Sequence, residues 1–139
     1  MVLWYRLMHE LGIAIGLADA TWESAREAGL TKVHLVRVAV GALSGVDPAA
    51  LASAWELTRE RPELQTAQVQ CEYIPVSIFC HSCCRTVQPN ENWRLICPLC
   101  QIPSSDVRTG RELHLVQLEG EWCPSACNRR VSWNSGADC

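Results

Sequence analysis

Two Cys-x-x-Cys pairs in a chain of only 139 residues constrain the fold more than any other feature. Cys80-His-Ser-Cys83 and Cys97-Pro-Leu-Cys100 are separated by 13 residues, close to the spacing found in four-cysteine zinc sites. Four thiolates form a closed tetrahedral shell around Zn(II), which leaves no position for a substrate water. The pattern therefore predicts a small lobe held together by a structural metal ion.

The segment between the pairs has little apolar material with which to build a core. Its apolar residues are Val87, Trp93, Leu95 and Ile96. A lobe of this size depends on its metal for most of its stability. The alternative for a chain with nine cysteines is a disulfide framework, but that belongs to secreted proteins and the cysteines here concentrate in metal-ligand spacing.

The sequence leaves the roles of three residues beside the cysteine pairs undecided. Zinc knuckles often place a glycine directly after the second cysteine, where the chain turns left-handed, but Cys84 and Gln101 stand there. Cys84 is a candidate substitute ligand or an oxidation-sensitive neighbour. His81 is a candidate ligand, although an ordinary exposed histidine is the commoner case.

The charge and hydropathy pattern excludes several partner classes. A net charge of −3 gives no general attraction to nucleic acid or to an anionic membrane. No apolar run approaches the roughly 20 residues that span a bilayer, and MVLWYRL is too short for a signal-peptide core. We therefore expect a cytoplasmic protein without nucleic-acid or membrane partners.

Periodicity predicts two helices and three strands around the cysteine module. The first expected helix covers 8–28, and its apolar face is formed by Leu11, Ile15, Ala18, Trp22 and Ala25. The second begins at Pro48 with Asp47 as N-cap, and its buried face is formed by Leu51, Trp55 and Thr58. The expected strands cover 32–40, 66–74 and 111–120; in the second, Ala67, Val69, Cys71 and Tyr73 alternate with polar residues. Gly29 is expected to end the first helix.

This order predicts an α+β fold in which helices pack on a short β-sheet and a zinc-ribbon-like lobe is inserted before the last strand. We expect the α+β domain to cover 1–78 and 106–122, the zinc-binding domain 79–105, and a disordered tail 123–139. The tail holds Cys123, Cys127 and Cys139, which allow a third metal site as the alternative to a dispensable end.

His9 and Glu10, directly after the internal Met8, allow two interpretations. As polar residues at a helix start they need no function, since Glu10 is favourable near the positive end of the helix dipole. As a metal site, an imidazole with deprotonated backbone amides suits square-planar Ni(II), and a free amine beside the histidine would complete the set.

Several motifs in one order resemble the HypA/HybF family of nickel metallochaperones. They are MHEL at Met8, VGALSGVDP after the first strand, and CHSC followed by CPLC; the resemblance runs from Met8 to Glu121. It implies a nickel-binding α+β lobe with a separate zinc lobe, and transfer of Ni(II) as cargo to the [NiFe]-hydrogenase large subunit together with the GTPase HypB. Some relatives also supply urease through its maturation proteins.

The resemblance also implies roles for individual residues. His9 becomes the essential nickel ligand, Glu10 contributes its backbone amide and a candidate side-chain oxygen, and Asp47 is an auxiliary carboxylate. The zinc ligands would be Cys80, Cys83, Cys97 and Cys100. Family members begin at the methionine that corresponds to Met8, so in a chain that starts at Met1 this residue has no free amine to offer the metal.

Two other functions compete with this interpretation. A nucleic-acid-binding zinc ribbon is suggested by the basic residues Arg85, Arg94, Arg108 and Arg111, but the acidic net charge argues against it. A thiol redox protein could use Cys83 and Cys84, but no thioredoxin-like βαβ pattern surrounds them. No catalytic constellation or phosphate-binding loop is found in the motifs, and we expect the protein not to be an enzyme.

Overall fold

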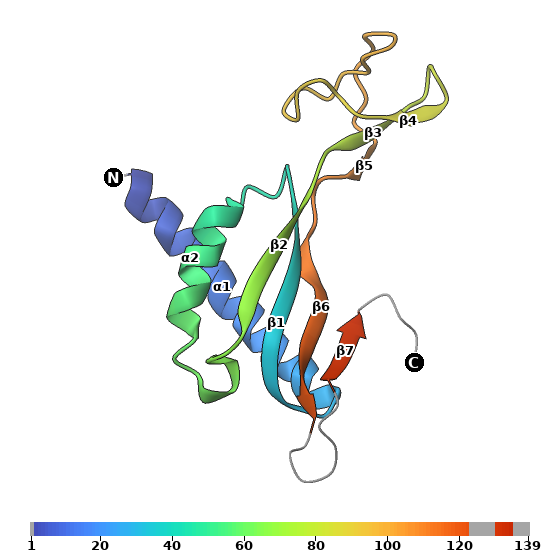
Figure 1. Ribbon diagram of the computed structural model, residues 1–139. Helices are drawn as coiled ribbons and strands as arrows, with labels where there is room; N and C mark the ends of the chain where they lie inside the picture. The colour runs from blue at the N-terminus through green and yellow to red at the C-terminus, as the bar shows by residue number, and fades with distance from the viewer. Residues whose placement is uncertain (1, 123–129, 135–139) are drawn as a thin grey trace. The chain divides into compact units, whose positions relative to one another are not determined.

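The computed structural model describes the backbone of residues 2–122 and 130–134 and the side chains of residues 8–122. The helices and strands are α1 (Val2–Glu27), β1 (Leu30–Gly41), α2 (Pro48–Thr58), the short 3-10 helix η1 (Pro62–Leu64), β2 (Gln68–Ile74), β3 (Ser77–Cys80), β4 (Arg85–Val87), β5 (Val107–Thr109), β6 (Leu113–Trp122) and β7 (Arg130–Asn134). The predicted mixed helix and sheet class is confirmed, and the cysteine module lies before β6 as expected (Figure 1).

The chain divides into two compact units. The first consists of Met1–Val38, Asp47–Glu72 and His114–Cys139, and the second of Ala39–Val46 and Tyr73–Leu113. The predicted zinc-binding segment 79–105 lies inside the second unit, which also takes in residues 39–46. None of the helices that the structure describes combines the length and apolarity needed to cross a lipid bilayer.

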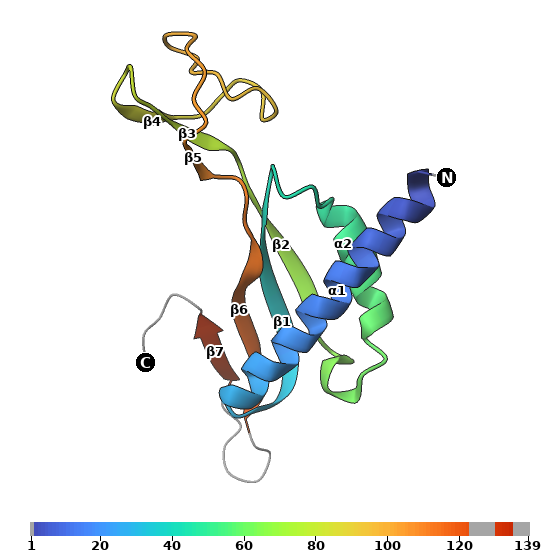
Figure 2. The ribbon, with the colours of Figure 1, turned by 180° about the vertical axis from the view of Figure 1, so that it is seen from behind.

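The first unit is built on the strand order β2-β1-β6-β7, and α1 crosses one face of this sheet with α2 packed against it (Figures 1 and 2). Val33, Val36 and Val38 of β1 are fully buried, whereas Thr31 and Lys32 near the start of the strand are exposed. Gly120 of β6 is required for close pairing, because a Cβ there would lie 2.0 Å from the Lys32 carbonyl oxygen.

Helix α1 differs from the sequence prediction at its start and in part of its buried face. It begins at Val2, upstream of the expected residue 8, and its buried side is formed by Glu10, Ala14, Leu17, Ala18, Thr21 and Ala25. Ala18 and Ala25 are buried as predicted, whereas Ile15, also predicted on the apolar face, is 46% exposed. Small side chains allow α1 to approach its neighbours closely, so they occupy the buried side. Gly29, with φ +77°, follows the helix as predicted.

Helix α2 agrees with its prediction. The Asp47 carboxylate accepts a hydrogen bond from the Ala49 N–H at 3.0 Å, and Pro48 occupies the first turn. Leu51, Trp55 and Thr58 are buried as predicted. The indole N–H of Trp55 donates to the Ala67 carbonyl at 3.0 Å, so this large side chain is buried without an unpaired polar group.

Strands β2 and β7 each depart from the prediction in one respect. Tyr73, expected on the buried face of β2, is 54% exposed: it lies one residue past the end of the first unit's segment at Glu72, and its hydroxyl accepts a hydrogen bond from Asn92 at 3.0 Å. Residues 130–134, expected in a disordered tail, form β7 antiparallel to β6, with Leu118 opposite Trp133. The tail cysteines Cys123, Cys127 and Cys139 lie outside the described residues.

The second unit contains the three-stranded sheet β4-β3-β5. Ile78 of β3 is fully buried and pairs with Val87 of β4. Residues 39–46 join this unit through backbone hydrogen bonds, including Gly41 N–H to the Glu112 carbonyl at 2.7 Å. Gly41 permits this approach, since a Cβ there would lie 2.1 Å from the carbonyl oxygen of Gly110.

Candidate metal centre

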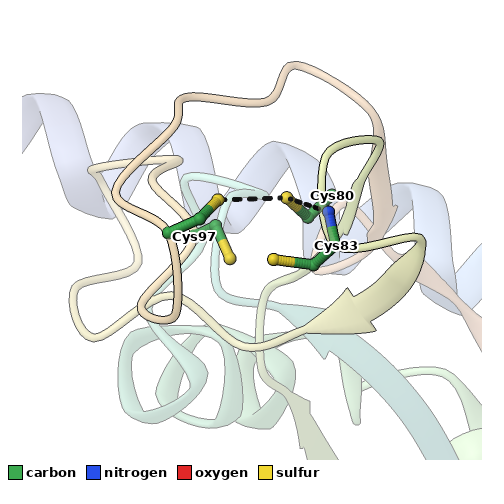
Figure 3. A group of neighbouring side chains, drawn as sticks. Cys80, Cys83 and Cys97 are labelled. Atoms are coloured by element: carbon green, nitrogen blue, oxygen red, sulfur yellow. Dashed lines mark hydrogen bonds between the residues drawn. The ribbon is translucent and has the colours of Figure 1, made fainter.

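Four cysteine side chains converge in the second unit. The Sγ atoms of Cys80, Cys83, Cys97 and Cys100 all lie within 4.8 Å of one another, and Figure 3 shows the labelled cysteines pointing toward a common centre. Cys80 and Cys97 are buried, whereas Cys83 and Cys100 are half-buried. Across residues 8–122 this is the only group of three or more His, Cys, Asp or Glu side chains arranged to hold a metal ion.

Local backbone geometry brings the four sulfurs together. Cys80 is the last residue of β3 and pairs with Arg85, so the chain turns between them and its Cys83 N–H approaches the Cys80 Sγ at 3.4 Å. In the second knuckle the Gln101 N–H donates to the Cys97 carbonyl at 2.9 Å, and the Cys97 N–H to the Ile102 carbonyl at 3.0 Å. The two knuckles are therefore shaped by hydrogen-bonded turns.

Both knuckles turn left-handed at the residue after their second cysteine. Cys84 has φ +51° and Gln101 has φ +62°, and these are the only non-glycine residues with positive φ in the described part of the chain. The left-handed conformation thus occurs at the two positions where zinc knuckles often have glycine. Residues with a Cβ are strained there, so the turns must be stabilised by their surroundings.

The thiols differ in acidity because their hydrogen bonds differ. A hydrogen bond to Cys100 and then burial raise the pKa of Cys83 to about 12. Burial opposes ionisation of Cys97, but the backbone N–H groups of Cys100 and Leu99 outweigh it and lower its pKa to about 7. The four thiols therefore do not all ionise near neutral pH by themselves. A divalent cation would supply the charge that keeps all four as thiolates, with release of protons.

The donor set fits a closed tetrahedral zinc site, since four thiolates are the ligands of structural Zn(II). The predicted apolar filling is only partly present, because Trp93 is 74% exposed while Leu95 and Ile96 are half-buried. With Val87 also half-buried, few apolar side chains surround the sulfurs. This arrangement supports a lobe whose stability depends on bound metal.

His81 and Cys84 lie outside the four-sulfur cluster. The His81 ring packs edge-on against Phe79 with centroids 4.9 Å apart, and its Nε2 lies 3.2 Å from a carboxylate oxygen of Asp106. The Cys84 thiol donates to the His81 carbonyl at 3.4 Å and is exposed. Both side chains therefore have partners other than the metal centre.

Asp106 is a supporting residue that the sequence did not indicate. Its carboxylate contacts His81 and accepts a hydrogen bond from Arg108 at 2.9 Å, and its carbonyl accepts from the Phe79 N–H at 2.8 Å. It thereby ties the segment before β5 to the first knuckle. A single aspartate after two serines carries no pattern that would have revealed this role.

The arginines near the cysteine pairs are partly neutralised. Arg108 is paired with Asp106, and Arg94 lies 3.9 Å from a Glu91 carboxylate oxygen while its guanidinium stacks over Trp93 at 5.3 Å. A nucleic-acid-binding ribbon would present free cations to phosphates. These pairings therefore do not favour that alternative.

The predicted nickel residues are not assembled into a ready-made site. His9 is exposed on α1, whereas Glu10 is 1% exposed and its Oε2 has no hydrogen-bond partner. Consecutive residues of a helix point about 100° apart, so these two side chains diverge. Asp47 is exposed, and its Oδ1 is engaged with the Ala49 N–H. A nickel site here must use backbone atoms or a rearrangement.

Comparison with known proteins identifies the chain. A family model described as hydrogenase/urease nickel incorporation, metallochaperone, hypA matches residues 8–120. The hydrogenase maturation factor HypA of Chloroflexus aggregans is 38% identical over 113 residues, 81% of this chain and 98% of the relative. The guanidine hydrolase-activating protein A of Synechocystis is 29% identical over 123 residues, 86% of this chain and 100% of the relative.

A solved structure agrees with these matches. The solution structure of the Ni metallochaperone HypA from Helicobacter pylori has a TM-score of 0.57 at 25% identity, covering 78% of this chain and 94% of that one. The fold, the four-cysteine centre and these matches together define a nickel-incorporation metallochaperone that serves hydrogenase maturation. The chain belongs to the HypA family. The predicted resemblance is thus confirmed, and residues 1–7 precede the matched region.

Proposed function

We propose that the chain binds Ni(II) and delivers it to the large subunit of a [NiFe]-hydrogenase, with the GTPase HypB as its partner. The observation that carries this proposal is the match of the nickel-incorporation family model over residues 8–120. The work would be transfer of a metal ion rather than catalysis. It would take place in the cytoplasm, where free thiols such as those of the centre stay reduced.

Urease maturation proteins are a second class of partner for this proposal. The family description names urease beside hydrogenase, and one relative carries the name of a hydrolase-activating protein. The cargo would be the same in each case. The recipient would be chosen by protein contacts rather than by the metal site.

In this proposal His9 is the principal nickel ligand. Its side chain is exposed at the second residue of the matched region, which supports access for a metal ion. Imidazole nitrogen and deprotonated backbone amides form the planar nitrogen-rich set that Ni(II) favours. Glu10 would supply its backbone amide, because burial of its carboxyl group does not favour a side-chain ligand in this conformation.

Asp47 would be at most an auxiliary ligand. Its Oδ1 accepts the capping hydrogen bond from Ala49, which leaves Oδ2 for a metal. Such a weak contribution suits a carrier, because cargo must be surrendered to the recipient enzyme. The Cys80, Cys83, Cys97 and Cys100 thiolates would hold a structural Zn(II) that stabilises the second unit and does not leave with the cargo.

The proposal is tested by Ni(II) titration of the zinc-loaded full chain and of His9→Ala, with His114→Ala as the matched control. His114 is an exposed histidine on β6 that the proposal does not use. We expect binding in the parent and in His114→Ala and loss of binding in His9→Ala. Equal binding in all three proteins would refute His9 as the nickel ligand.

Delivery requires a second measurement. The nickel-loaded chain is mixed with a metal-free hydrogenase large subunit, and nickel in the separated subunit is quantified with and without HypB. We expect nickel to move from the parent to the subunit. When the His9→Ala variant is incubated with Ni(II) and used in place of the parent, we expect no nickel in the subunit. Retention of nickel by the parent under all these conditions would contradict a carrier role.

A further inference from the structure

The backbone amides proposed as nickel ligands lie inside a formed helix. Helix α1 begins at Val2, so His9 and Glu10 stand well beyond its first four residues. Only the first four N–H groups of a helix are free, and each later N–H donates to the carbonyl four residues before it. The amides of His9 and Glu10 are therefore occupied by the carbonyls of residues 5 and 6.

Occupied amides cannot bind nickel without a local opening of the helix. A backbone nitrogen coordinates Ni(II) after it loses its proton to solvent, so the N–H that would donate to a carbonyl no longer exists. Each new Ni–N bond thus replaces one helical hydrogen bond. The helix upstream of His9 and the metal compete for the same two nitrogen atoms.

The buried carboxyl of Glu10 makes this part of α1 suited to opening. Glu10 is 1% exposed and its Oε2 lacks a hydrogen-bond partner, a state that is unfavourable for a carboxyl group. Unwinding the first turns would return this group to water. Downstream, Ala14, Leu17 and Ala18 are buried without such a penalty, so we expect the helix to stay formed from there.

We propose that residues 2–8 of α1 act as a built-in competitor of nickel, so that metal binding at His9 unwinds α1 up to Glu10 and reformation of these turns expels the metal. This inference rests on the proposed function, because it assumes that His9 and its neighbouring amides receive the cargo. It adds a release device that belongs to this chain. A partner that stabilises the helical form would drive unloading.

The first test uses two proline variants of the full chain. Met8→Pro makes residue 8 the earliest position at which the helix can start, which frees the amides of His9 and Glu10. Val2→Pro places proline at the existing start, where it is tolerated, and is the matched control. If the turns are formed about 90–99% of the time, Met8→Pro should bind nickel about 10- to 100-fold more tightly than the parent or Val2→Pro.

The second test follows the helix itself by amide hydrogen exchange of the zinc-loaded parent with and without Ni(II). We expect nickel to increase exchange in residues 2–10 and leave residues 14–25 protected, and His9→Ala to remove this response. Nickel binding that depends on His9 but leaves exchange unchanged, with no gain in Met8→Pro, would overturn the inference and keep the proposed function. No His9-dependent binding in any form, Met8→Pro included, would overturn both.

Discussion

The N-cap of α2 offers a test that separates a structural role of Asp47 from a metal-binding role. Its carboxylate accepts the Ala49 N–H at 3.0 Å, and this N–H has no helical partner of its own. Asp47→Ala removes the acceptor, whereas Asp47→Asn keeps an oxygen in the same place. The two substitutions therefore differ in the cap and agree in losing the carboxylate charge.

The magnitude follows from the exposure of the cap. Because Asp47 is exposed, water partly replaces the lost acceptor, and we expect Asp47→Ala to lower the free energy of unfolding by about 1 kcal/mol. With a denaturant dependence of about 2 kcal/mol per molar urea, the unfolding midpoint should fall by roughly 0.5 M. Asp47→Asn should remain within a few tenths of a kcal/mol of the parent, since asparagine caps about as well.

The assay is urea unfolding of the zinc-loaded proteins, followed by far-UV circular dichroism, with Ni(II) titration of the same samples. We expect Asp47→Asn to lose at most about tenfold in nickel affinity, the effect of a supporting rather than a principal ligand. Equal destabilisation by alanine and asparagine would refute the capping argument. Complete loss of nickel binding in a stable Asp47→Asn protein would make Asp47 a principal ligand.

Three further predictions concern backbone packing and the cysteine centre. Gly120→Ala should lower the free energy of unfolding by about 3 kcal/mol, because its Cβ would lie 2.0 Å from the Lys32 carbonyl oxygen. Gly16→Ala should raise it by about 1 kcal/mol, because a Cβ there meets nothing within 4 Å and alanine favours the helix. Equal urea midpoints for the two variants would contradict this. Gln101→Gly should relieve about 1 kcal/mol of left-handed strain, and zinc loss to a chelator should slow; faster loss would count against strain there. Cys97→Ala should abolish zinc retention by elemental analysis and expose amides of residues 77–109 to exchange while α1 stays protected; retained zinc would argue against a four-thiolate site.

The features that the sequence predicted well are those with a local chemical cause. The spacing of the two cysteine pairs was sufficient to predict the four-sulfur cluster, because each pair lies on one short turn. Asp47 followed by Pro48 indicated both the cap and the start of α2. In each case a few adjacent residues determine the geometry, so distant parts of the chain do not need to be known.

The buried face of α1 could be predicted only in part. The spacing of apolar residues correctly placed Ala18 and Ala25 on the buried side, but it also placed Ile15 there, which is exposed, and it did not include the buried Glu10. The choice depends on how closely the helix can approach what it packs against, which is a property of the assembled fold. Strand β7 was missed for a related reason, since its pairing depends on the free edge of β6.

The proposed nickel residues show the difference between sequence adjacency and a site. His9 and Glu10 are neighbours in the chain, yet one side chain is exposed and the other is buried. The sequence identified the residue types that suit nickel. It did not reveal that an upstream extension of the helix would engage their backbone amides.

The strand order of the first unit has a consequence for the time course of folding. β6 pairs with β1, and the Thr31 hydroxyl donates to the Glu121 carbonyl across 90 positions of the chain. Between β2 and β6 lie the 38 residues 75–112, which include all four clustered cysteines. During synthesis β6 cannot pair with β1 until this segment has been made. A long flexible connection also slows the pairing, because the entropy cost of closing a loop rises with its length. A metal ion bound by the four cysteines would shorten the connection, so we expect the sheet of the first unit to form faster when metal is present during folding.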